Sequence, residues 1–135
     1  MPTANPQLVP IIRLDDVICD RFSEQRILCL VDVEGAELEV LKGAMNLLNR
    51  IHKPIWLIEI CIDEHFATSD GRNPNLKATF KMFHDAGYRA YSVEGNLREV
   101  QMGEIDRIAE GGPNTIQGHN FIFSDHPVNQ IRLQK

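Results

Sequence analysis

Acidic side chains surround one glycine at the point where the first long apolar run of the sequence ends. Asp32 and Glu34 precede Gly35 and Glu37 follows it, at the close of residues 27–33. Three neighbouring carboxylates could bind a divalent cation, because hard cations take oxygen ligands, although the spacing of a calcium-binding loop is absent. Asp32 could instead only accept hydrogen bonds from backbone N–H groups of the turn. This turn is the first candidate for a functional site.

The residues on either side of the glycine predict a strand, a tight turn and a helix. Residues 27–33 are apolar and partly β-branched, and apolar residues return at helical spacing over 36–51. Glu37 and Glu39 fall in the first helical turn, where negative charge is favourable, so we interpret them as helix-stabilising acids. In open α/β sheets ligands bind beyond the carboxyl ends of the strands. We therefore expect the two acids before the glycine to face such a crevice.

A second apolar run predicts a neighbouring strand that carries another acid. Residues 55–62 are almost unbroken in apolar character, which is typical of a central strand with helices on both faces. Glu59 interrupts this run near its carboxyl end, where a buried carboxylate would require a partner or would have a raised pKa. The connection that follows, residues 63–73, is longer than the usual four to six or so and is typical of lids and binding loops.

The order of the elements predicts an α/β fold, a partial Rossmann-like doubly wound sheet that is mostly parallel and has an antiparallel carboxyl-terminal strand pair. The antiparallel pair comes from a hairpin over residues 88–100, and residues 120–123 form a last short strand. We expect one domain over residues 9–126, a disordered or leader segment at 1–8 and a tail at 127–135.

The first strand of this sheet would have an apolar edge without a neighbour, which native proteins avoid. Three things could cover it: the extended segment 8–13, a second copy of the chain, or a missing half of the sheet. A homo-oligomer formed through this edge is thus one of the expected arrangements.

Composition excludes several classes of partner. The chain of 135 residues has a net charge of −5 and a pI near 5.5, and its basic residues are scattered. We therefore expect neither a nucleic-acid surface nor a membrane surface. No apolar run is long enough to cross a bilayer, so the sequence predicts a cytoplasmic protein. Cys19, Cys29 and Cys61 share no metal-ligand spacing, and we interpret them as reduced, mostly buried thiols.

Three stretches together resemble the FkbM family of S-adenosylmethionine-dependent methyltransferases. They are VPIIRLDD at residues 9–16, LVDVEGAELEVLKGA at 30–44 and KPIWLIEI at 53–60. The Asp-x-Glu-Gly-x-Glu element followed by Leu-x-Gly-Ala is the most specific of these signatures. The resemblance extends over residues 9–124 and corresponds to the carboxyl-terminal half of the family's catalytic domain.

This resemblance implies transfer of a methyl group from S-adenosylmethionine to a hydroxyl of a sugar, polyketide or related metabolite. Asp32 would face the methionyl side of the cofactor or the acceptor, and Gly35 would contact the cofactor. The catalytic candidates are Asp32, Glu34 and Glu59, the latter two as proton acceptors or ligands of the acceptor hydroxyl. No metal is expected.

The long loop after Glu59 supplies the predicted substrate-binding residues. His65 and Phe66 could close over a small-molecule hydroxyl acceptor, a prediction that comes from their position and not from the family. The family's glycine-rich cofactor loop and its ribose-binding acid have no counterpart in this sequence. We therefore expect weak cofactor binding by this chain alone, as in a part of a longer protein or a shortened relative.

Two other functions are consistent with parts of the sequence. A non-catalytic interaction module could keep the sheet and use the open edge for a partner. A phospho-receiver is suggested by Asp15 and Asp16 after one apolar run and Asp63 after another, but no lysine ends the last strand.

Overall fold

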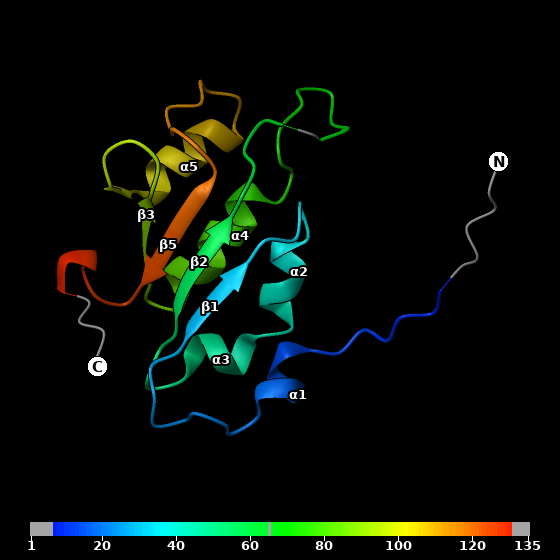
Figure 1. Cartoon of the computed structure of the whole chain (residues 1–135). Helices are drawn as coiled ribbons and strands as arrows, with labels where there is room; N and C mark the ends of the chain where they lie inside the picture. Colours follow the sequence, from blue (N-terminus) through cyan, green and yellow to red (C-terminus); the bar gives the residue numbers. More distant parts are fainter. Residues whose placement is uncertain (1–6, 65, 131–135) are drawn as a thin grey trace.

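The computed structural model describes residues 7–64 and 66–130, which form a mixed α/β fold around one five-stranded sheet (Figure 1). The strands are β1 (Leu28–Val31), β2 (Ile55–Glu59), β3 (Arg89–Ser92), β4 (Arg98–Val100) and β5 (Asn120–Ser124). The helices are α1 (Leu14–Ile18), α2 (Glu37–Lys42), α3 (Met45–Asn49), α4 (Leu76–Asp85) and α5 (Met102–Ala109), followed by the 3-10 turn η1 (Val128–Gln130).

The strands lie in the order β1-β2-β5-β3-β4, and within the described part of the chain only β1 and β2 pair in parallel. The prediction of a mostly parallel sheet is therefore wrong. The last strand, β5, lies between β2 and β3 and runs antiparallel to both. As a result β3 has the same direction as β2 but is not its neighbour. The predicted antiparallel hairpin is confirmed as the β3–β4 pair.

The single helix predicted over residues 36–51 is two short helices, α2 and α3. The chain breaks at Gly43, whose N–H donates back to the last turn of α2 while its carbonyl accepts from the N–H of Asp15 (2.9 Å). The Asp15 carboxylate then accepts from the N–H groups of Asn46 and Leu47 at 2.9 and 3.0 Å. Asp15 thus caps α3 from another helix, a structural role that removes support for a phospho-receiver.

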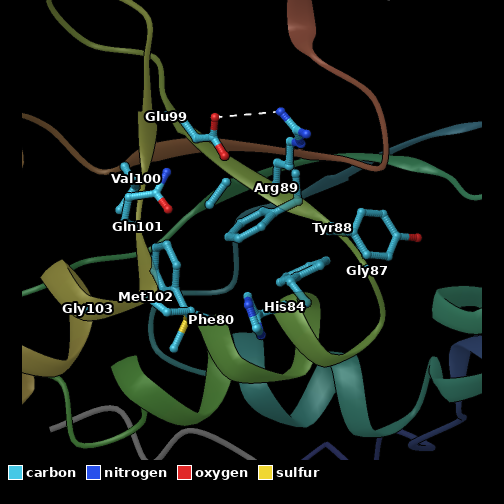
Figure 2. A pocket seen from close by; sticks show the side chains of 13 residues that line it. Phe80, His84, Gly87, Tyr88, Arg89, Glu99, Val100, Gln101, Met102 and Gly103 are labelled. Atoms are coloured by element: carbon cyan, nitrogen blue, oxygen red, sulfur yellow. Dashed lines mark ion pairs between the residues drawn. The ribbon is translucent and has the colours of Figure 1, made fainter.

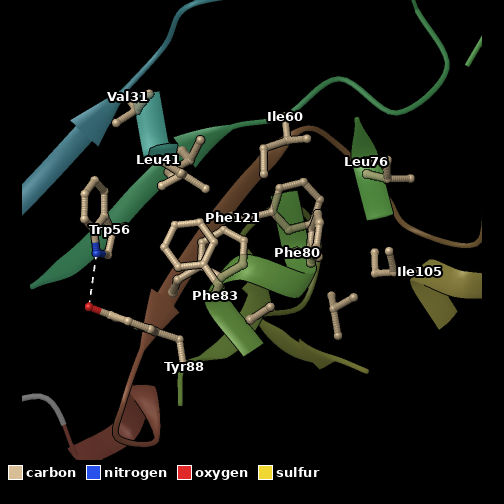
Figure 3. Packing of buried hydrophobic residues seen from close by; sticks show 14 of the residues in the cluster. Val31, Leu41, Trp56, Ile60, Leu76, Phe80, Phe83, Tyr88, Ile105 and Phe121 are labelled. Atoms are coloured by element: carbon tan, nitrogen blue, oxygen red, sulfur yellow. Dashed lines mark hydrogen bonds between the residues drawn. The ribbon is translucent and has the colours of Figure 1, made fainter. Parts of the chain in front are cut away.

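The core lies on one face of the sheet, between the strands and helices α2 to α5 (Figure 3). Alternate residues of β2, Trp56 and Ile58, are fully buried in it, whereas Leu57 and Glu59 point to the other face and are only half-buried. The expectation of helices on both faces of β2 is therefore wrong. Aromatic rings fill the centre: Phe83 stacks on Phe123 with ring centroids 3.8 Å apart.

The outer edge of β1 has no paired strand within the described residues. Leu28 and Leu30 of this strand lie on the face of the sheet opposite the core, since they alternate with Cys29 and Val31, and their side chains are 64% and 70% exposed. The segment 8–13 does not cover them, because it runs away from the sheet with Leu8 and Ile11 fully exposed (Figure 1). The predicted leader and tail lie partly outside the described residues.

None of the helices among the described residues is long and apolar enough to cross a membrane.

A charged contact joins β4 to α5. Both terminal nitrogens of Arg98 donate to the Glu104 carboxylate, at 2.8 and 3.0 Å, and the Thr115 hydroxyl donates to it at 2.6 Å. Glu104 is mostly shielded, with its side chain 13% exposed. The hydrogen bond from Arg98 lowers the pKa of Glu104 below its ordinary value of 4.5.

We predict that Phe83→Ala lowers the free energy of unfolding by about 3–5 kcal/mol, because it removes a buried ring that touches several others. Urea denaturation measures this change. Leu97→Ala is the control, since Leu97 is 51% exposed. An equal loss for both variants would contradict the proposed core.

We also predict a pH-dependent stability difference between the wild type and Glu104→Gln. Because folding lowers the pKa of Glu104, its stabilisation is complete above the unfolded pKa and disappears as the pH falls through the folded pKa. The wild type should be more stable by up to about 1 kcal/mol at neutral pH, and the difference should vanish in acid. A difference that is constant with pH would refute the assignment.

Candidate functional site

A cavity of about 410 Å³ lies at the carboxyl ends of β1 and β2, where β5 begins. Side chains from four separate segments surround it, and most of them are acidic or aromatic. The lining residues are Glu34, Glu59, Cys61, Glu64, Phe66 and His119. This is the end of the sheet where the sequence predicts a ligand crevice.

The turn between β1 and α2 forms one wall of the cavity. Glu34 and Gly35 both have left-handed backbone conformations, with φ of 46° and 101°. The Gly35 N–H donates to Oε1 of Glu37 at 2.8 Å, and Glu37 is 2% exposed. Glu37 therefore does more than favour the helix start: its buried carboxylate holds the turn that presents Glu34.

Gly35 also allows the loop after β2 to approach the turn. A Cβ atom at Gly35 would lie 3.4 Å from Cε1 of Phe66, and the positive φ would strain any L side chain there. The aromatic ring thus packs against the glycine, directly beside Glu34. This contact joins the two segments that the sequence places on either side of β2.

The end of β2 brings in His119 from the start of β5. The N–H of Ile60 donates to the His119 carbonyl at 2.7 Å, which extends the pairing of Glu59 with Asn120. His119 Nε2 lies 3.5 Å from a carboxylate oxygen of Glu64. His119 Nδ1 is buried without a hydrogen-bond partner within the described part of the chain.

Hydrogen bonds from Arg72 and Asn73 fix the end of the loop over residues 63–73. The Asn73 side chain donates to the Cys61 carbonyl at 2.9 Å, and the Asn73 N–H donates to the Ile62 carbonyl at 2.8 Å. Arg72 donates to the carbonyl groups of Ile108 and Gly112 at the end of α5. These bonds fix where the loop leaves and rejoins the body, and so where Phe66 can lie.

The structure brings some of the predicted site residues together and leaves others apart. Glu34, Glu59 and Phe66 line the same cavity, and Gly35 contacts Phe66. Asp32 is exposed at the end of β1 and is not among the lining residues. Its carboxylate has no hydrogen bond to the turn in the described chain, where Glu37 accepts the Gly35 N–H instead. His65 lies outside the described residues.

Sequence reasoning missed three lining residues, namely Cys61, Glu64 and His119, and it assigned Glu37 to the helix start without its hydrogen bond to Gly35. Cys61 follows Glu59 by two positions and thus emerges at the same end of β2, which is a signal that the sequence contains. His119 could not be found in this way, because its place depends on β5 pairing beside β2.

The cavity has a negative electrostatic potential that acts on Cys61. Burial raises the pKa of the Cys61 thiol, and the nearby carboxylates of Glu59, Glu37, Glu64 and Glu34 raise it further. A higher pKa means less thiolate at neutral pH and slower reaction with electrophiles. The reaction rate of the Cys61 thiol therefore depends on the negative charge of the site and can be used to measure it.

The three thiols are free and differ in exposure from the prediction. Cys29 and Cys61 are half-buried and Cys19 is exposed, so the expectation of mostly buried thiols holds only in part. Burial raises the pKa of Cys29 to about 11.

Another cavity, of about 420 Å³, lies at the opposite end of the sheet, between α4, the start of β3 and the start of α5 (Figure 2). Arg89 and Glu99 form an ion pair at 3.9 Å on its rim, and Phe80 and Met102 lie beneath (Figure 2). None of the predicted site residues lines it. The cavity beside Gly35 is therefore the candidate site.

The structure defines a mixed α/β protein with an acidic cavity at the carboxyl ends of its only parallel strand pair among the described residues. Residues 2–90, about two thirds of the chain, match the family described as the methyltransferase FkbM domain. The chain belongs to this methyltransferase family. The match includes both acidic strand ends and the loop with Phe66. Searches of curated proteins and of solved structures each found no match.

We predict that Glu59→Gln accelerates alkylation of Cys61 by iodoacetamide at a fixed, mildly alkaline pH. Removal of a nearby negative charge lowers the pKa of the thiol and increases the thiolate fraction. Peptide mass spectrometry measures the rate at each cysteine separately.

Glu39→Gln is the matched control for this experiment, since Glu39 is exposed and paired with Lys42 at 2.6 Å. A Cys61 rate that is unchanged by Glu59→Gln, or changed equally by the control, would contradict the electrostatic coupling.

Proposed function

We propose that the chain takes part in S-adenosylmethionine-dependent methyl transfer to a hydroxyl group of a sugar, polyketide or related small molecule, bound in the cavity beside Gly35. The observation that carries this proposal is that Glu34 and Glu59, from the two strand ends of the family signature, line one cavity with Phe66. Family membership supports methyl transfer and does not favour a non-catalytic interaction module.

The fold is consistent with one half of a Rossmann-like sheet, which we include in the proposal. β1, β2 and β3 run in the same direction, and the cavity lies where β1 and β2 end. Ligands of open α/β sheets bind at such strand ends.

The acidic side chains would bind the acceptor and remove its proton. Glu59 is half-buried at the end of β2, and Glu34 lies across the cavity on a turn that Glu37 holds. One carboxylate can accept a hydrogen bond from the reacting hydroxyl and take its proton as the oxygen becomes methylated. The other carboxylate can orient the acceptor, which matters because the oxygen must approach in line with the methyl group.

The residues present fit the reacting end of the methyl donor. S-adenosylmethionine supplies a methyl group whose bond to sulfur breaks as the acceptor oxygen takes it, and a neutral thioether remains. A cationic sulfonium is compatible with the carboxylates and the ring of Phe66. We propose that exposed Asp32 and the backbone at Gly35 face the donor from outside the cavity lining.

The edge of β1 enters the proposal as the place where a further sheet element or a second copy of the chain would lie. Leu28 and Leu30 are exposed next to this edge, on the face of β1 opposite the core, although they have the character of core residues. Burial of such side chains is worth about 1.5–3 kcal/mol each.

We predict that Glu59→Gln or Glu34→Gln, whichever removes the proton acceptor, lowers the rate of methyl transfer by about 100-fold to 10,000-fold, the usual contribution of such a group, and that the other variant has a smaller effect. Transfer of a labelled methyl group from S-adenosylmethionine to a panel of hydroxyl compounds measures this rate. Glu39→Gln should retain the wild-type rate.

Calorimetry with S-adenosylmethionine is the accompanying test. Binding in the micromolar range supports a catalytic chain. Absence of binding together with absence of transfer would refute the proposal for this chain.

A further inference from the structure

The described residues that line the candidate cavity carry an excess of negative charge. Three of its six lining residues are glutamates, namely Glu34, Glu59 and Glu64, and no described lining residue is a lysine or an arginine. The imidazole of His119 lies 3.5 Å from Glu64, at the wall. An acceptor that carries a phosphate or a carboxylate would be repelled by such a surface.

The negative charge surrounds Cys61, one of the lining residues. Apart from its burial, the Cys61 thiol is affected by four carboxylates, those of Glu59, Glu37, Glu64 and Glu34, and all of them raise its pKa. Glu37 adds its charge from behind the wall, where it is 2% exposed. The carboxylates therefore come from α2, from the turn before it, from β2 and from the loop after β2.

An aromatic ring lies among these carboxylates. Phe66 packs on Gly35 at van der Waals distance, next to Glu34, and it shares the cavity with Glu59. Carboxylates together with an aromatic face are the groups that bind an organic ammonium ion, by charge-assisted hydrogen bonds and a cation–π contact. A neutral polyol would use the hydrogen bonds and could pack its C–H face on the ring, but it would gain nothing from the excess negative charge.

We propose that the methyl acceptor carries a protonated amine near the reacting hydroxyl, as amino sugars and other amino alcohols do. This inference rests on the proposed function and names its substrate class. One carboxylate takes the hydroxyl proton, while another, with Phe66, holds the ammonium group. Glu34, Glu64 and Phe66 then determine specificity, and the cavity of about 410 Å³ has the size of ordinary small-molecule sites.

The sulfonium of the methyl donor is the other cation that could occupy this cavity, so the experiment distinguishes the two. Binding of glucosamine and of N-acetylglucosamine to the full chain is measured by calorimetry or NMR titration at neutral pH and low salt. The two sugars share their hydroxyl groups, but only the first has a positive charge. S-adenosylmethionine and S-adenosylhomocysteine form the matching pair for the donor.

The expected result is that glucosamine binds at least about tenfold more tightly than its N-acetyl derivative, which corresponds to about 1.4 kcal/mol. Glu34→Gln and Phe66→Leu should each remove most of this preference, while Glu39→Gln retains it. Higher salt should weaken glucosamine binding only. Circular dichroism melting curves identify any variant that fails to fold. For such a variant, the salt dependence of glucosamine binding by the wild type takes its place as the test of the charge preference.

Equal affinities for the two sugars would overturn the inference. So would a Glu34→Gln effect confined to S-adenosylmethionine, since the cation would then be the sulfonium of the donor. Failure of the proposed function has a different signature, namely no labelled methyl on any compound while the charge preference in binding persists.

Discussion

The hydrogen bond from the Gly35 N–H to the buried Glu37 carboxylate is the contact on which the site depends. It closes a turn in which two consecutive residues, Glu34 and Gly35, adopt left-handed conformations. Such a backbone persists only when its surroundings hold it. The same turn places Glu34 in the cavity lining and presents Gly35, on which Phe66 packs, so this bond supports both.

The two acidic strand ends serve one site because the sheet aligns them. Parallel pairing of β1 with β2 places their carboxyl ends together, and antiparallel insertion of β5 adds His119 at the same level. The loop over residues 63–73 is fixed by Asn73 to β2 and by Arg72 to α5. Paired strand ends therefore form one side of the cavity. The loop that carries Phe66 forms another side, and hydrogen bonds hold its end at residues 72–73.

Local patterns predicted the parts of the fold that depend on local interactions. The apolar run before Gly35, the glycine itself and the strand with Glu59 can be recognised in the sequence, because periodicity and turn chemistry act over a few residues. Pairing of β5 with β2 is non-local, so neither the antiparallel sheet nor the place of His119 could be read in this way. Which acid lines the cavity depends on the backbone at Glu34, so the sequence alone could not show that Asp32 lies outside the lining.

The bare edge of β1 has a consequence for handling the protein. Its outward N–H and C=O groups, with Leu28 and Leu30 beside them, can template the addition of a foreign strand. The four residues of β1 are therefore a place where copies of the chain could associate in concentrated samples, despite the net negative charge. A lysine in place of Leu30 would serve as a gatekeeper there, and this position is not among the residues that line the candidate cavity.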